Sequence, residues 1–226
     1  MSASLTISRP LILVTSFEPF GGSPMNPTIE IAKLLATMNP QIGSRNYLAL
    51  PVIGGIDPQS AWHAALQRIE QIQPDVVVAL GESAKADCVH IEMRAVNVRD
   101  SRIADNAGLQ LRNDVVIAGA PDTHSSTLPT HAMLHACLSC GVPAQLSTDA
   151  GTFLCNEIMF RLLEHVHSTK KSSLDFHNFT AGFIHVPQLP EQALVRGGPS
   201  MDSNTATRAV HAMLNAVAAN LIPKVG

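Results

Sequence analysis

The sequence predicts an α/β protein: a three-layer α/β/α sandwich around a mainly parallel twisted sheet. Short apolar runs rich in β-branched residues alternate with stretches of helical period, and this alternation is typical of βαβ units. The chain has 226 residues, of which 46% are hydrophobic and only 15% are charged. This length and composition favour a single α/β domain that spans residues 1–226.

Five apolar runs are expected to form the sheet, at residues 11–15, 47–52, 75–80, 144–147 and 181–186. Residues 89–98 also look extended, because apolar and polar side chains alternate along much of this stretch. The rest of the region between Gly81 and Leu128 has no clear period. A long irregular segment inside a domain is often a functional loop.

Five stretches of helical period are expected to form helices, at residues 28–38, 59–72, 129–140, 152–166 and 204–221. Asn26-Pro27 and Asp57-Pro58 precede the first two, and Gly141 can close the third, as expected for proline near a helix start and glycine after its end. The polar residues 168–178 are expected to form a surface connection. With helices on both faces, ligands should bind beyond the carboxyl ends of the strands.

Charge and cysteine content exclude several classes of function. The formal charge is −3, and no basic run is longer than Lys170-Lys171, which argues against nucleic acid or an anionic membrane as partner. No apolar stretch approaches the roughly 20 residues that span a bilayer. Four cysteines are too few for a disulfide framework, so a cytoplasmic protein with free thiols is expected. The low charged fraction also suggests a surface partly buried in a homo-oligomer.

Cys155 is the best candidate nucleophile. It lies in the first turn of an expected helix that follows a strand, where backbone N–H groups and the helix dipole stabilise a thiolate. The alternative is a buried structural cysteine, which is the commoner role. His185 ends an expected strand and should face the same edge of the sheet, where it suits a Cys–His pair. An ordinary core or surface histidine is the alternative.

Glu92 is the candidate third group, which would orient the imidazole. It lies in a half-apolar extended stretch, where an unpaired carboxylate is costly. Alternatively, it faces water from an edge strand. The loop after the first strand contains Phe17 and Phe20 beside Gly21-Gly22, and the two rings either fold back onto the sheet or line an apolar pocket.

A metal site is considered and rejected at His131, His135 and Cys137. On the expected helix the two histidines share one face and Cys137 lies well round from it, so packing at the helix end is preferred.

Several blocks in order together resemble a known family. They are residues 13–22 with Asn26-Pro27, residues 92–97 followed by 102–106, residues 150–156 and residues 182–187. In this order and spacing they resemble pyroglutamyl peptidase I, the pyrrolidone-carboxylate cysteine peptidases. The resemblance extends from about residue 11 to residue 192.

The resemblance implies a phosphorylase/hydrolase-like fold and removal of N-terminal pyroglutamyl (5-oxoproline) residues from peptides, without metal or cofactor. It implies that Cys155 is the nucleophile, His185 the general base and acid, and Glu92 the third triad member. The enzymes it resembles are cytosolic and often tetrameric, so a dimer or tetramer is expected. Substrate contacts are expected at Phe17, Phe20, Asn26, Glu82, Arg102 and Phe153.

The sequence departs from the family pattern after the third strand. Glu82 stands where an amide is usual, Met93 stands where an arginine usually follows the triad glutamate, and Ser16 replaces a usual glycine. A carboxylate accepts a lactam N–H but does not donate to its carbonyl unless protonated. The residues Glu82, Ala86 and Met93 motivate one rival hypothesis, a weakened relative that only binds a related acyl or lactam ligand. A phosphorylase-like enzyme on the same sandwich is a second rival, although no phosphate-binding glycine loop is present.

Overall fold

The structure is a computed structural model that describes residues 9–171 and 177–222. Its main sheet has six strands, which are β1 (Leu11–Phe17), β2 (Ser44–Leu50), β3 (Val76–Ser83), β4 (Val89–Glu92), β7 (Ala144–Ser147) and β8 (Thr180–Pro187). Their order across the sheet is β2-β1-β3-β8-β4-β7. The first four in this order are parallel, whereas β4 pairs antiparallel with β8 and parallel with β7. The predicted mainly parallel sheet is confirmed.

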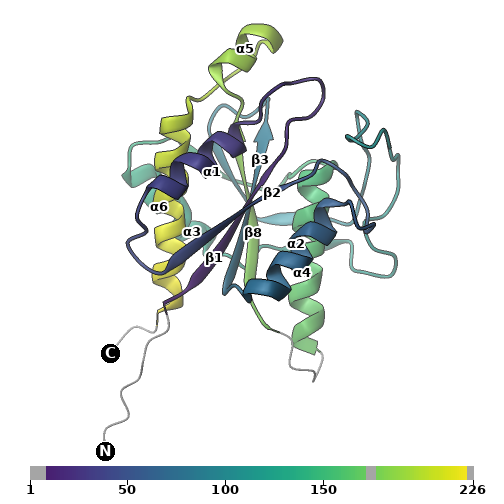
Figure 1. The fold of residues 1–226 in the computed structure, drawn as a ribbon, viewed down its shortest axis with the longest axis horizontal. Helices are drawn as coiled ribbons and strands as arrows, with labels where there is room; N and C mark the ends of the chain where they lie inside the picture. The colour runs from purple at the N-terminus through teal and green to yellow at the C-terminus, as the bar shows by residue number, and fades with distance from the viewer. Residues whose placement is uncertain (1–8, 172–176, 223–226) are drawn as a thin grey trace, which may run out of the picture.

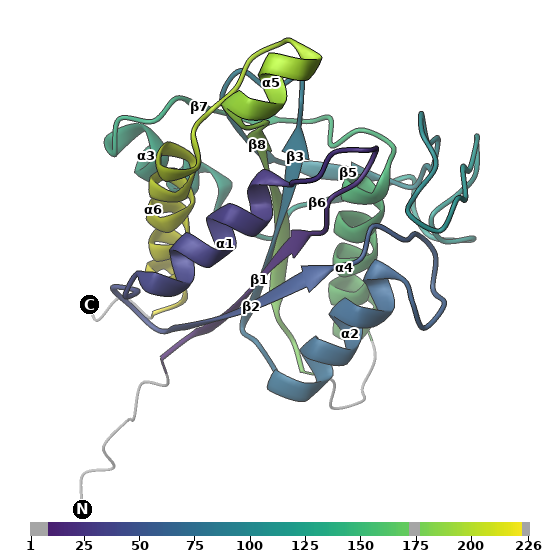
Figure 2. The same cartoon turned by 45° about the horizontal axis from the view of Figure 1, so that its top comes forward.

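Helices cover both faces of this sheet (Figure 1). They are α1 (Pro27–Thr37), α2 (Ala61–Ile72), α3 (Thr130–Ser139), α4 (Leu154–Lys171), α5 (Pro190–Arg196) and α6 (Ser203–Leu221). Helices α1, α3 and α6 lie on one face, and α2 and α4 lie on the other, while α5 stands beyond one end of the sheet (Figures 1 and 2). The result is the three-layer sandwich that the sequence predicts.

Two apolar clusters form the core, one on each face of the sheet. Along β8, Phe183 points into the cluster that includes α4, and Ile184 points into the cluster that includes α6. This alternation follows from the two-residue period of a strand. Because the central strands are apolar on both faces, they read as nearly continuous hydrophobic runs in the sequence.

Side-chain caps set three of the helix starts. Oδ1 of Asn26 accepts a hydrogen bond from the Thr28 N–H, and Asp202 accepts one from Thr205. The Ser60 hydroxyl accepts from the His63 N–H, so α2 begins at Ala61 and not at the predicted residue 59. Such caps satisfy N–H groups that have no partner within the helix.

The structure also differs from the sequence prediction in several elements. The extended stretch 89–98 is broken at Met93, and its second part is β5 (Arg94–Val96). This strand pairs antiparallel with β6 (Thr123–Ser125) in a separate sheet, and β6 was not predicted. Helix α5 was also not predicted, because seven residues are too few to show a helical period. Helix α4 continues to Lys171, past the predicted start of the polar connection at residue 168. Residues 172–176 of that connection lie outside the described residues.

Within the described ranges, no helix is long and apolar enough to cross a membrane.

Candidate active site

Glu92 and His185 meet across the antiparallel pair β4 and β8. Glu92 is the last residue of β4, and it lies opposite Phe183, two residues before His185. Their side chains share the face covered by α4, and Nδ1 of His185 lies 2.8 Å from Oε1 of Glu92. The carboxylate is fully buried, and the histidine is 6% exposed. The Nδ1–H group therefore donates to the carboxylate, which fixes the orientation of the ring.

Cys155 reaches the other side of the same imidazole. It is the second residue of α4 and is half-buried, and its side chain is close enough to His185 to raise the pKa of the imidazole. Because Glu92 holds Nδ1, the Nε2 atom of His185 is the one left for the thiol. The side chains of Cys155, His185 and Glu92, which are distant in sequence, thus form one series in which Glu92 binds the imidazole and the thiol lies on its other side.

Electrostatic contacts within this series favour the protonated imidazole. Burial lowers the pKa of His185, but the charges of Cys155 and Glu92, and their hydrogen bonds with the ring, outweigh burial and raise this pKa to about 10. In contrast, burial is the main cause that raises the pKa of the Cys88 thiol to about 11, and Asp87 adds to it. Burial likewise raises the pKa of Cys137 to about 12. Neither of these two thiols has a histidine partner among the causes of its shift, so Cys155 remains the candidate nucleophile.

Gly81 makes room for the thiol. A Cβ atom at this position on β3 would lie 2.8 Å from Sγ of Cys155 and 2.6 Å from the Phe183 ring. Carbon atoms do not approach that closely without displacement of a neighbour. The absent side chain lets the start of α4 lie directly over the sheet next to β8.

Asn156 holds the start of α4 in place, although the sequence analysis gave it no role. Its Oδ1 accepts from the Val96 N–H, and its Nδ2 donates to the carbonyls of Val96 and Val98. The side chain is completely buried, and all its bonds go to the segment that includes β5. A polar residue adjacent to the candidate nucleophile was visible in the sequence, but its partners 60 residues away were not.

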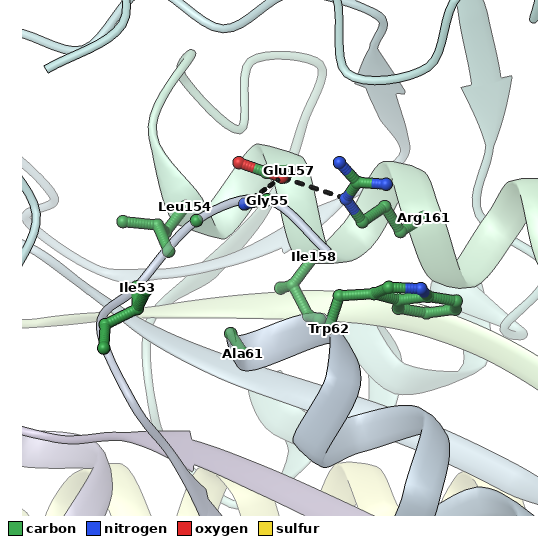
Figure 3. A pocket seen from close by; sticks show the side chains of 9 residues that line it. Ile53, Gly55, Ala61, Trp62, Leu154, Glu157, Ile158 and Arg161 are labelled. Atoms are coloured by element: carbon green, nitrogen blue, oxygen red, sulfur yellow. Dashed lines mark hydrogen bonds and ion pairs between the residues drawn. The ribbon is translucent and has the colours of Figure 1, made fainter. Parts of the chain in front are cut away.

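Glu157, the next residue of the same helix, binds the loop that follows β2 (Figure 3). Its Oε1 accepts from the Gly55 N–H and from Nε of Arg161, each at 2.9 Å. Nη1 of Arg99 lies 3.5 Å from the same oxygen. These contacts lie behind the start of α4, beside a small cavity lined also by Trp62, and they leave Cys155 on the other side.

An aromatic pocket adjoins Cys155. Its lining residues are Phe17, Phe20, Asn26, Val52, Glu82, Phe153, Leu154 and Cys155. The rings of Phe20 and Phe153 lie 6.2 Å apart in a tilted arrangement. Of the substrate contacts expected from the sequence, five line this pocket. Arg102 does not line this pocket. It is exposed, and its backbone carbonyl accepts a hydrogen bond from the Gln110 side chain.

Glu82 is the one acidic residue among those that line this pocket, and its carboxylate is paired. Nη1 of Arg196 lies 2.7 Å from Oε1, and Nε2 of Gln192 donates to Oε2 at 2.9 Å. Both partners come from α5, while the Glu82 side chain is only 2% exposed. The departure from an amide at position 82 is therefore accompanied by a cation that neutralises the added charge.

The histidine and cysteine group considered for metal binding does not converge. His131 and His135 are exposed, whereas Cys137 is fully buried. The thiol of Cys137 donates to the Val142 carbonyl, as expected for a packed residue at a helix end.

Comparison with known proteins gives concordant results. The family model of pyroglutamyl peptidase matches residues 11–220. A pyrrolidone-carboxylate peptidase from Vibrio vulnificus is 37% identical over 206 residues, which cover 90% of each chain. The crystal structure of pyroglutamyl peptidase I from Bacillus amyloliquefaciens superposes with a TM-score of 0.85 at 28% identity, over 92% of this chain and 95% of that one. A mutant pyrrolidone carboxyl peptidase from Pyrococcus furiosus gives a TM-score of 0.84 at 32% identity, over 94% and 100% of the two chains.

Gly81→Ala is expected to slow alkylation of Cys155 by iodoacetamide, because the new methyl group displaces Sγ or the Phe183 ring. The free energy of unfolding should fall by about 1–3 kcal/mol, the usual cost of overpacking. Mass spectrometry of the labelled protein measures the rate, and urea unfolding measures the stability.

Gly182→Ala is the matched control for this experiment. A Cβ there would lie 2.5 Å from Oγ of Ser126, in a contact that does not involve Cys155. We expect similar destabilisation but wild-type labelling. Equal labelling rates in the two variants would contradict the role assigned to Gly81.

Proposed function

The chain belongs to the pyroglutamyl peptidase family, and we propose on this basis that it is a cysteine exopeptidase that removes an N-terminal pyroglutamyl residue from peptides. The observation that carries the assignment of roles is the series of Cys155, His185 and Glu92 beside an aromatic pocket, in which Glu92 binds His185 and the thiol interacts with the same ring. Cys155 is the nucleophile, His185 is the general base and then acid, and Glu92 orients and charges the imidazole.

The reaction begins with proton transfer from the Cys155 thiol to Nε2 of His185. The thiolate attacks the carbonyl carbon that follows the lactam ring, and the carbonyl oxygen becomes an oxyanion. N–H groups in the first turn of α4 have no partner within the helix and point toward such an oxyanion. As the carbon–nitrogen bond breaks, the His185 imidazolium gives its proton to the departing amine.

Hydrolysis of the resulting thioester restores the enzyme. His185, now neutral, takes a proton from water, and the hydroxide attacks the acyl carbon. The carbon–sulfur bond breaks, pyroglutamate is released, and the imidazolium and thiolate form again. Every proton in this sequence passes through the one ring nitrogen that Glu92 leaves free.

The pocket fits a small and nearly apolar ring. The rings of Phe17, Phe20 and Phe153 can cover the methylene groups of a five-membered lactam. Asn26 already uses Oδ1 for the helix cap and one amide hydrogen for the Glu18 carbonyl, which leaves a second amide hydrogen. We infer that Glu82, paired with Arg196, serves as an acceptor for the lactam N–H.

Two supporting observations weigh against the rival hypotheses. A protein that only binds its ligand has no need for an imidazole whose pKa is raised to about 10 by a thiol and a carboxylate. Phosphorolysis requires a cluster of phosphate-binding groups, whereas the pocket beside Cys155 is mainly aromatic and apolar. Hydrolysis by the thiol is therefore the proposed reaction.

We also propose that the protein acts in the cytoplasm, as a single α/β domain that assembles into a homo-oligomer. Free thiols at all four cysteines suit a reducing compartment. Leu194 and Val195 on α5 are 87% and 88% exposed, which suits a surface that a second copy of the chain would bury.

Cys155→Ser should abolish release of aminomethylcoumarin from the pyroglutamyl amide of this fluorophore, because a serine hydroxyl is not ionised by His185. Cys140→Ser is the control, and it should keep wild-type turnover since Cys140 lies on the other face, against α6. Residual turnover of the Cys155→Ser variant near the wild-type rate would disprove the covalent mechanism.

The rate should fall at high pH, as His185 loses the proton that the departing amine needs. Because the folded-state pKa is about 10, the basic limb of kcat/KM should be centred there. Glu92→Gln removes a charge that raises this pKa, so the limb should move to lower pH. A limb at the same pH in both proteins would show that Glu92 does not act on His185.

Arg196→Met should lower kcat/KM for the pyroglutamyl amide by about tenfold or more, because a buried carboxylate loses a charged hydrogen-bond partner. At the same time the unbalanced negative charge of Glu82 should improve use of an N-terminal prolyl amide, whose ring nitrogen is cationic. The ratio of the two kcat/KM values measures this change. Arg208→Met, at an exposed position on α6, should leave the ratio unaltered, and a wild-type ratio in Arg196→Met would refute the pairing argument.

A further inference from the structure

A second group of metal-binding side chain types lies at the start of β4, outside the pocket beside Cys155. One ligand atom from each of Asp87, Cys88 and His90 lies within 4.8 Å of the other two. Asp87 is exposed, whereas Cys88 and His90 are half-buried. None of the three lines the pocket that contains Cys155. The proposed peptidase mechanism uses none of them.

We propose that Asp87, Cys88 and His90 bind a divalent transition-metal ion of the zinc class, with water as the fourth ligand. A thiolate, an imidazole and a carboxylate are the ligands that zinc takes in proteins, whereas magnesium and calcium prefer oxygen alone. Tetrahedral zinc with bonds of about 2.0–2.3 Å separates its ligand atoms by about 3.3–3.8 Å. A contraction of roughly 1 Å, within reach of side-chain rotation at this half-exposed turn, closes the site.

Gln145 lies beside the candidate ligand His90. It is opposite His90 on the neighbouring strand β7, and its Nε2 atom is 2.8 Å from Nε2 of the ring. In this arrangement the amide donates and the ring Nε2 accepts, so the proton of a neutral ring is on Nδ1. A half-turn of the amide would bring its oxygen to the ring instead, so that Nε2–H donates to Gln145 and Nδ1 keeps its lone pair for the ion. Histidine ligands are usually held in this way, with the second ring nitrogen bonded to a neighbouring acceptor.

The proposed metal site lies at the start of the strand that carries Glu92. His90 pairs directly with His185 across β4 and β8, and Glu92 follows two residues later on the same face. An ion held by residues 87, 88 and 90 would tie the turn before β4 to the strand that delivers Glu92. Because the ion binds the folded chain, it should stabilise the protein against unfolding.

Cobalt is the probe for the test, since a cobalt–thiolate bond gives a charge-transfer band in the near ultraviolet. The background is the full chain with Cys155→Ser, so that the active-site thiol cannot contribute. After treatment with a chelator, a single equivalent of Co²⁺ should produce the band, zinc should displace it, and zinc should raise the thermal midpoint. Failure of Co²⁺ to produce a thiolate band would overturn the proposal.

Three further variants locate the ion in the same background. Cys88→Ser should abolish the band, whereas Cys140→Ser should keep it; the reverse result would disprove the assignment. Gln145→Leu, which removes only the group that orients His90, should weaken Co²⁺ binding by about tenfold or more. Because turnover is not measured, these results are independent of the proposed peptidase mechanism.

Discussion

The hydrogen bond between Glu92 and His185 is the constraint on which the site depends. A fully buried carboxylate is tolerated only beside a cation or donors, and Oε2 of Glu92 has no hydrogen-bond partner within the described part of the chain. The imidazole must therefore stay close to Oε1 and donate its Nδ1–H to it. The antiparallel pairing of β4 with β8 supplies this arrangement, because Glu92 at the end of β4 lies opposite Phe183, two residues before His185.

The start of α4 supplies the third group, and small local features decide its position. Gly81 has no side chain, so nothing at that position collides with Sγ of Cys155. Asn156 binds the backbone near β5, and Glu157 binds the backbone of Gly55. These contacts come from different directions and from segments far apart in sequence. The helix start is therefore held rigidly, which suits the nucleophile that we propose at Cys155, since its thiol must stay close to one ring nitrogen of His185.

Sequence patterns predict the layers, the parallel strands and the five longer helices, because periodicity and caps are local signals. They predict an extended stretch at residues 89–98, but neither its break at Met93 nor β6, because the pairing of β5 with β6 depends on contacts between segments distant in sequence. Cys155 and His185 could be proposed because each lies at the end of an expected element, and Glu92 because it is a carboxylate in a half-apolar extended stretch. Asn156 and Arg196 could not be proposed, since their importance comes only from partners that folding brings near. Arg102 illustrates the reverse case, a residue singled out by its motif that the fold leaves exposed.

The pair of Glu82 and Arg196 shows how a departure from a family pattern can be absorbed. A carboxylate in an aromatic pocket would by itself favour a cationic ligand and disfavour a neutral lactam. Arg196 and Gln192 both come from α5, so this short helix, which adjoins the end of the sheet, is what makes the acidic residue compatible with a neutral ring. The same contacts hold α5 in position and leave Leu194 and Val195 exposed. Any partner that moved α5 would therefore alter the charge balance of the pocket, because the cation of the pair lies on the helix and the anion lies on β3.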